Sequence, residues 1–146
     1  MNVLLTLVPS VALLLGAGDA AKDAEKIQGT WTVADVERGG SKMPESLRTK
    51  MQVIIKDGSM AIVVDKDDPK TKGEEAKLEL DPSTKPKSLQ MTSPDKDKPT
   101  VRGIYELEGD TLKMCWRMNG GARPSAFGTV PQSDLILFVL NRVTTK

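Results

Sequence analysis

The fold of this protein is decided by residues 101–118, which have the sequence VRGIYELEGDTLKMCWRM. Apolar and polar side chains alternate on both sides of Glu108-Gly109-Asp110, and this period of two is typical of β-strands with one covered face. The glycine between the two runs allows the chain to reverse. The stretch therefore predicts a β-hairpin. Its second strand places four apolar residues on one face: Leu112, Met114, Trp116 and Met118.

The same pattern extends through most of the remaining chain. Residues 51–56 and 59–65 are rich in Val, Ile and Met, and Asp57-Gly58 between them is a strong signal for a tight hairpin turn. Pro44 favours the first turn of a short helix near residues 44–50. Further strands are predicted at residues 29–36, 76–80, 87–92 and 135–140, the last of them apolar on both faces and therefore fully covered.

About eight strands of ordinary length, mostly joined by short polar turns, predict an all-β protein. A closed barrel is favoured over a sandwich because closure removes the exposed strand edges that a flat sheet has to protect. We therefore expect one small antiparallel up-and-down β-barrel. The polar stretches 66–73 and 93–99 are expected to be solvated loops.

The N-terminus has the features of an export signal. Residues 3–15 are an almost unbroken apolar run, and the first charged side chain is Asp19. Thirteen helical residues span about 20 Å, which is less than the roughly 30 Å core of a bilayer. Small residues follow at 16–21, as in a signal peptidase site. The sequence therefore predicts a signal peptide at residues 1–20, a barrel domain at 21–146 and a secreted or periplasmic product without a membrane span.

Composition excludes several classes of function. The 21 basic and 20 acidic residues leave a net charge of +1, so we expect no nucleic-acid partner. A single cysteine allows no intrachain disulfide. Histidine is absent, which removes the usual Ser-His-Asp and Cys-His mechanisms and the common zinc sites.

The remaining acidic residues and glycine pairs have ordinary explanations. Most acidic residues lie in polar turns beside lysines, which favours a solvated face over a carboxylate pair for glycoside cleavage. The acidic stretches 65–68 and 95–97 lack the spacing of a calcium loop. Gly39-Gly40 and Gly120-Gly121 lack the flanking motif of a phosphate cradle and are expected to be turn glycines. We predict no enzyme activity, no metal and no cofactor.

Two features at opposite ends of the mature chain resemble the lipocalin superfamily. Gly29-Thr30-Trp31 has its Gly-x-Trp form, and Arg142 lies on the last predicted strand. The resemblance implies that Trp31 plugs the closed end of the barrel while Arg142 packs its cation over the indole face.

A more specific resemblance rests on residues 103–115 and 123–127, together with the Lys85-Pro86-Lys87 turn and the signal peptide. These are similar to a family of small secreted lipocalin-like domains of planctomycete bacteria, whose function is unknown. The resemblance covers nearly all of the mature chain. It implies fold and origin, but no activity, ligand or catalytic residue.

The sequence does not tell whether such a barrel is hollow. Eight-stranded barrels either hold one small ligand or are filled by their own side chains. Five residues are candidates for lining a pocket for an apolar ligand: Met91, Tyr105, Met114, Trp116 and Met118. Core filling is the alternative role for them. Cys115 shares a strand face with Lys113 and Arg117, whose charge would favour a reactive thiol, whereas a covered thiol would be inert.

The leading hypothesis is an exported, non-enzymatic binding module that holds a small apolar molecule or a segment of a protein partner. The alternative is a packed structural or interaction domain that has no internal ligand and acts through its outer surface.

Overall fold

The computed structural model describes residues 21–143, and the predicted signal peptide at 1–20 lies outside them. Within this range the chain forms nine strands: β1 Gly29–Arg38, β2 Ser41–Lys42, β3 Gln52–Lys56, β4 Ser59–Val63, β5 Ala76–Asp81, β6 Lys87–Thr92, β7 Val101–Glu108, β8 Thr111–Arg117 and β9 Leu135–Arg142. The helical segments are residues 21–26, α2 Glu45–Arg48 and the 3₁₀ turn η1 Pro69–Thr71. All strand pairs are antiparallel.

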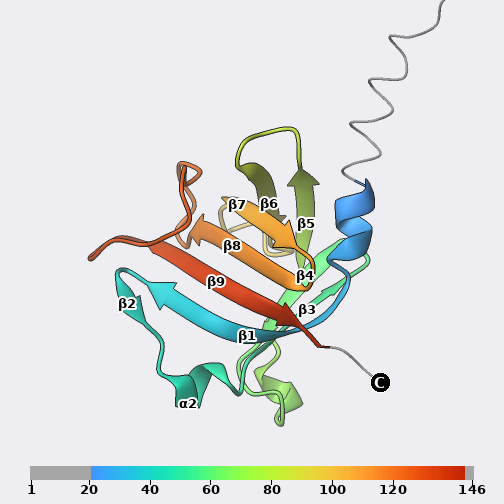
Figure 1. Cartoon of the computed structure of the whole chain (residues 1–146), viewed down its shortest axis with the longest axis vertical. Helices are drawn as coiled ribbons and strands as arrows, with labels where there is room; N and C mark the ends of the chain where they lie inside the picture. Colours follow the sequence, from blue (N-terminus) through green and yellow to red (C-terminus); the bar gives the residue numbers. More distant parts are fainter. Residues whose placement is uncertain (1–20, 144–146) are drawn as a thin grey trace, which may run out of the picture.

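The sheet closes on itself through its first and last long strands (Figure 1). β1 pairs with β3 over its first residues and with β9 from Trp31↔Arg142 to Arg38↔Ile136, with a register shift between Val33 and Asp35. The two-residue β2 pairs with the far end of β1 and lies outside the ring. The result is a closed antiparallel barrel of eight strands, which confirms the predicted fold class.

Two tight turns set the register of the strands. Asp57 and Gly58 have φ values of 52° and 79°, and positive φ at both central positions defines the turn type that suits a two-residue hairpin. Lys56 therefore pairs with Ser59, as expected from the sequence. The second hairpin turns at Gly109, where φ is 56° and Glu108 pairs with Thr111.

Some features differ from the prediction. β9 extends to Arg142, and only Phe138 and Leu140 of this strand are buried, so the prediction of a fully covered strand was wrong. Its outer face is half-exposed because the segment 119–134 shields it incompletely. The helical stretch that the structure describes at 21–26 was not predicted. α2 lies where the short helix was expected.

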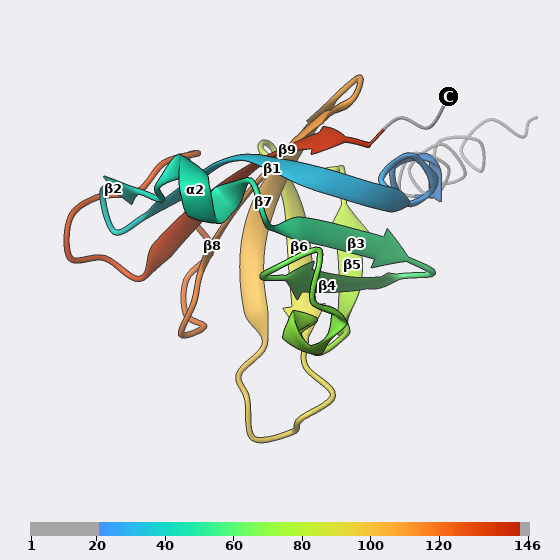
Figure 2. The same ribbon diagram turned by 90° about the horizontal axis from the view of Figure 1, so that it is seen from below.

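Alternate residues of the strands fill the barrel interior. They form one cluster with Ile27 and Met51: Trp31, Val33, Val36, Val53, Ile55, Met60, Leu78, Leu89, Met91, Tyr105, Leu112, Met114, Trp116, Phe138 and Leu140. Figure 2 shows the helix at 21–26 beside the start of β1, with α2 and β2 on the opposite side. We call the end that holds Trp31 the closed end and the end that holds Trp116 the open end.

Candidate functional site

The closed end is built around Trp31, whose side chain has no exposed surface. The indole Nε1 donates a hydrogen bond of 2.9 Å to the carbonyl of Ile27, just after the 21–26 helix. The Arg142 guanidinium lies over the ring, 4.4 Å from its centroid. A cation over an indole contributes about 1 to 2 kcal/mol when partly desolvated.

Arg142 also ties three parts of the chain together at this end. Its guanidinium donates to the carbonyls of Lys26 and Gln28, the latter at 2.9 Å, and forms an ion pair of 3.1 Å with Asp110. The structure thus brings the two residues of the lipocalin resemblance into contact. Their hydrogen-bond partners are the helix, the residues between the helix and β1, and the β7–β8 hairpin turn.

A second cluster anchors the helix from its other side. The Asp23 side chain is nearly buried and accepts hydrogen bonds from the Tyr105 hydroxyl at 2.7 Å and from the Lys87 ammonium at 2.9 Å. Burial alone would raise the pKa of Asp23, but these two hydrogen bonds and the charges of Lys87 and Lys26 outweigh it and hold the pKa below its ordinary value. Burial, together with Asp23, raises the pKa of Tyr105, which therefore stays a hydrogen-bond donor.

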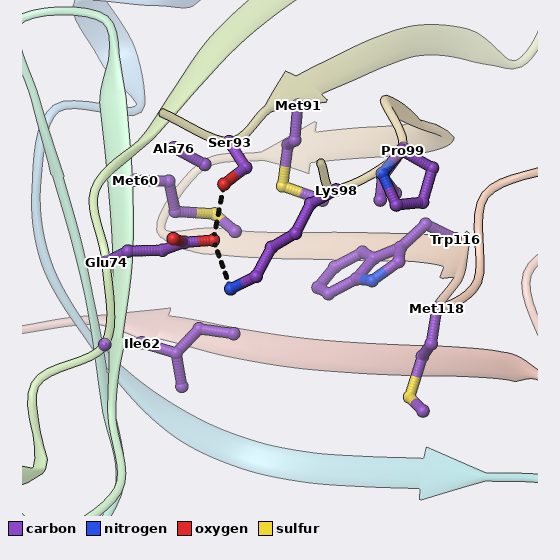
Figure 3. Close-up of a pocket in the computed structure, with 12 residues that line it drawn as sticks. Met60, Ile62, Glu74, Ala76, Met91, Ser93, Lys98, Pro99, Trp116 and Met118 are labelled. Atoms are coloured by element: carbon purple, nitrogen blue, oxygen red, sulfur yellow. Dashed lines mark hydrogen bonds and ion pairs between the residues drawn. The ribbon is translucent and has the colours of Figure 1, made fainter. Parts of the chain in front are cut away.

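The open end holds an apolar pocket of about 390 Å³ (Figure 3). Its lining comes from β4, β5, β6, β7, β8 and the loops beside them: Met60, Ile62, Gly73, Glu74, Ala76, Met91, Ser93, Lys98, Pro99, Val101, Trp116 and Met118. Phe138 stacks on Trp116 with 5.2 Å between ring centroids, which holds the indole in place.

The β4–β5 part of the barrel wall beside the pocket is irregular. The β4–β5 ladder has two residue pairs, Ser59↔Lys77 and Met60↔Ala76. Beyond them the register shifts by one residue, and the pairing continues through a hydrogen bond from the Gly73 amide to the Ile62 carbonyl at 2.9 Å and through the bridge between Val63 and Lys72.

Three polar side chains lie together at the edge of the pocket. Glu74 Oε1 accepts hydrogen bonds from Ser93 Oγ at 2.9 Å and from Lys98 Nζ at 3.2 Å. Figure 3 shows the Lys98 stem crossing the pocket with its ammonium turned toward Glu74. The pair is exposed, so it adds at most about 1 kcal/mol to stability.

The structure gathers three of the five candidate lining residues in this pocket and separates the other two. Met91, Trp116 and Met118 line it. Met114, two residues before Trp116, is buried in the core, where the barrel is filled. Tyr105 belongs to the closed end, where it holds Asp23.

Sequence reasoning missed Glu74, Ser93 and Lys98, which lie in or beside stretches predicted to be solvated loops. The signal that would have found them is the hairpin register. β5 and β6 pair Lys77 with Thr92, which places the residues before β5 beside those that follow β6. The alternation pattern predicts both strands but does not give their relative shift.

Cys115 lies on the outer face of β8 and is fully buried. The segment 119–134 covers it, and the thiol donates a weak hydrogen bond to the Gly128 carbonyl at 3.5 Å. Burial raises the pKa of Cys115, an effect that exceeds the opposing influence of the Arg117 charge. The structure therefore favours the inert thiol.

Within residues 21–143, no three side chains of the metal-binding types gather at one place, and no helix has the length and apolarity needed to cross a bilayer. No family model, curated protein or solved structure matches this chain. The fold and the site are therefore described by their own geometry. The chain is a lipocalin-like barrel of eight antiparallel strands, with Trp31 and Arg142 packed together at one end and an apolar pocket at the other.

Proposed function

We propose that this protein is a non-enzymatic binding module that holds a small apolar molecule in the pocket at the open end of the barrel. The observation that supports it is the pocket itself, about 390 Å³ and lined mainly by methionine, tryptophan and aliphatic side chains. Ligand sites in proteins range over roughly 300 to 1,000 Å³ and are mostly apolar with a few polar groups. A pocket near the lower limit suits a small molecule.

The side chains that line the pocket can adapt to ligands of different shape. Met60, Met91 and Met118 surround the opening (Figure 3), and unbranched thioether side chains can fit apolar shapes of several kinds. The rest of the interior is packed, since Met114, Phe138 and Leu140 fill the barrel toward the closed end. A ligand would therefore enter the mouth of the barrel and stop there.

Two further parts of the proposal come from the sequence. The protein would act in the periplasm or outside the cell, after removal of the signal peptide at residues 1–20. It would belong to the planctomycete family of secreted lipocalin-like domains. The contact between Trp31 and Arg142 supports the second part, as does the closed barrel.

The absence of histidine supports a non-enzymatic role. Glu74 is the single acidic residue of the pocket lining, and Lys98 and Ser93 already engage its Oε1. Acid–base catalysis without histidine can use a pair of carboxylates. The residues that line the pocket do not form such a pair.

The alternative is a domain that holds no ligand and acts through its outer surface, which the packed interior favours. Native mass spectrometry of the exported protein separates the two. A reproducible co-purified small molecule supports the binding module, whereas an empty barrel with a protein partner supports the alternative. The mass of the exported chain also gives its N-terminus and tests the predicted cleavage.

A direct test uses 1-hexanol as a neutral apolar probe and the fluorescence of Trp116 as the signal. We expect a saturable change in emission in the wild-type protein. Ala76→Phe places a ring in the pocket and should abolish that change, while Ala122→Phe, an exposed position in the β8–β9 loop, should leave it intact. Circular dichroism checks that both variants fold. The absence of a saturable change in the wild type would refute the proposal.

A further inference from the structure

The pocket already contains a side chain with the form of a ligand. Lys98 reaches across the opening on a stem of four methylene groups, and its ammonium meets the Glu74 carboxylate at 3.2 Å (Figure 3). The Lys98 side chain is chemically an alkylammonium ion. Its methylene chain lies on an apolar surface, and its ammonium group pairs with a carboxylate.

From this arrangement we propose that the pocket binds small primary amines with an apolar body. The ligand's ammonium would take the place of the Lys98 ammonium on Glu74, and its body would lie among Met60, Met91 and Trp116. The inference rests on the proposed function, the binding of a small apolar molecule in this pocket, and adds the chemical class of that molecule.

The two members of the ion pair differ in how firmly they are held. The Glu74 side chain is 39% exposed, and Ser93 Oγ also donates to its Oε1 at 2.9 Å. The Lys98 side chain is 55% exposed. An ion pair with this exposure adds little to stability, so moving Lys98 into solvent costs little. Glu74 would then remain at the edge of the pocket with its hydrogen bond from Ser93.

A negatively charged ligand suits this pocket less well than an amine. A carboxylate bound to Lys98 would take the cation away from Glu74 and place two anions at one opening, where like charges disfavour each other. The neighbouring cation does not compensate, because Lys72 forms its own ion pair with Glu75 at 2.9 Å. An amine, by contrast, exchanges one ammonium for another and leaves the charge of the opening unchanged.

The test compares hexylamine, 1-hexanol and hexanoate, which share a six-carbon chain, by isothermal titration calorimetry at neutral pH. We expect hexylamine to bind about fivefold tighter than hexanol, since hydrogen bonds between charged groups exceed neutral ones, and hexanoate to bind more weakly than hexanol. Glu74→Gln should remove the preference for the amine and leave hexanol affinity unchanged. Glu45→Gln, an exposed change of the same kind on α2 and outside the pocket lining, is the matched control and should keep the preference.

A second pair of variants tests the displacement of Lys98. Lys98→Ala removes the internal competitor and should tighten hexylamine binding about threefold or more. Lys96→Ala makes the same charge change on the same loop, outside the pocket lining, and should have no effect.

The outcomes separate the two proposals. Equal binding of hexanol and hexylamine by the wild type would overturn the amine inference and leave the apolar binding module standing. Tightest binding of hexanoate would also overturn it and would assign recognition to Lys98. If none of the three probes binds, both proposals fail.

Discussion

The Asp23 carboxylate joins the N-terminal helix to the barrel at the level of single atoms. It is 7% exposed, and its two hydrogen bonds come from β6 and β7 through Lys87 and Tyr105. A nearly buried carboxylate is tolerated because its charge is paired and its oxygens are hydrogen-bonded. The free energy of unfolding should therefore depend on pH through this group.

The sign of that dependence follows from the lowered pKa of Asp23. A carboxyl group whose pKa is lower in the folded than in the unfolded state stabilises the fold above the unfolded value. That stabilisation is lost as the pH falls through the folded value. We expect Asp23→Asn to cost about 2 kcal/mol at pH 7, the size of a hydrogen-bonded charge, and the difference from wild type to vanish in strong acid.

Urea unfolding of both proteins at a series of pH values measures this effect. Asp57→Asn, a change in an exposed turn, is the control and should show no such convergence. A gap between Asp23→Asn and the wild type that stays constant from neutral to acid pH would contradict the assignment.

At the scale of elements, the β7–β8 pair depends on a glycine because the two strands approach closely at Gly103. A Cβ built there would lie 2.5 Å from the Cys115 carbonyl oxygen and 2.9 Å from the Trp116 Cβ. Backbone cannot move aside as a flexible side chain can. The two strands would have to separate beside the pocket.

We therefore expect Gly103→Ala to destabilise the protein by about 3 kcal/mol, the upper part of the range for overpacking. Gly109→Ala is the matched control. Its φ of 56° is strained for alanine, but no atom lies within 4 Å of the added Cβ. It should cost about 1 to 2 kcal/mol. Chemical denaturation of both variants measures the loss of unfolding free energy in each. A loss for Gly103→Ala that is equal to or smaller than the loss for Gly109→Ala would contradict the close approach of the two strands.

The segment 119–134 forms a cover over the outer face of β7, β8 and β9. Arg123 Nε donates to the Gly103 carbonyl at 3.1 Å, and Arg117 forms an ion pair of 3.1 Å with Asp134. The cover encloses Cys115, so the reactivity of this thiol reports how often the segment opens.

A thiol that is buried and has a raised pKa should react slowly with a disulfide reagent at neutral pH. We expect labelling of the native protein to be about 100-fold slower than in urea, or slower still. Arg123→Met removes one attachment of the cover and should accelerate labelling of the native protein. Arg48→Met, a half-buried position on α2 and outside the cover, should not. Rapid labelling of the wild type would show that the cover is open in solution.

At the scale of the whole molecule, closure by the β1–β9 pair couples the two ends of the barrel. β8 runs from Thr111 near the closed end to Trp116 near the open end, and both of its edges are paired. Separating any neighbouring pair opens the shared core. Small domains of this kind usually unfold in one cooperative step.

The two tryptophans allow this to be measured. Trp116→Phe leaves Trp31 as the reporter of the closed end, and Trp31→Phe leaves Trp116 as the reporter of the open end. In each variant the fluorescence transition in urea should coincide with its own transition in far-ultraviolet circular dichroism. Separate midpoints within one variant would show that the two ends unfold independently.

Local sequence patterns predicted the eight strands of the barrel, the two tight hairpins and hence the fold class. These follow from local properties: side-chain alternation along a strand and the positive φ that Asp57 and Gly58 adopt in the turn. The association of Trp31 with Arg142 was expected from a resemblance, and the structure places them 4.4 Å apart.

Which interior residues pack and which face a cavity could be seen only in the folded barrel. Met114 and Trp116 share one face of β8, yet one lies in the filled core and the other lines the pocket. The pairing of Glu74 with Lys98 and the burial of Cys115 were likewise absent from any local pattern. The physical reason is that period two fixes the face to which a side chain points. The stagger between strands and the path of the loops fix its position along the barrel and its partners.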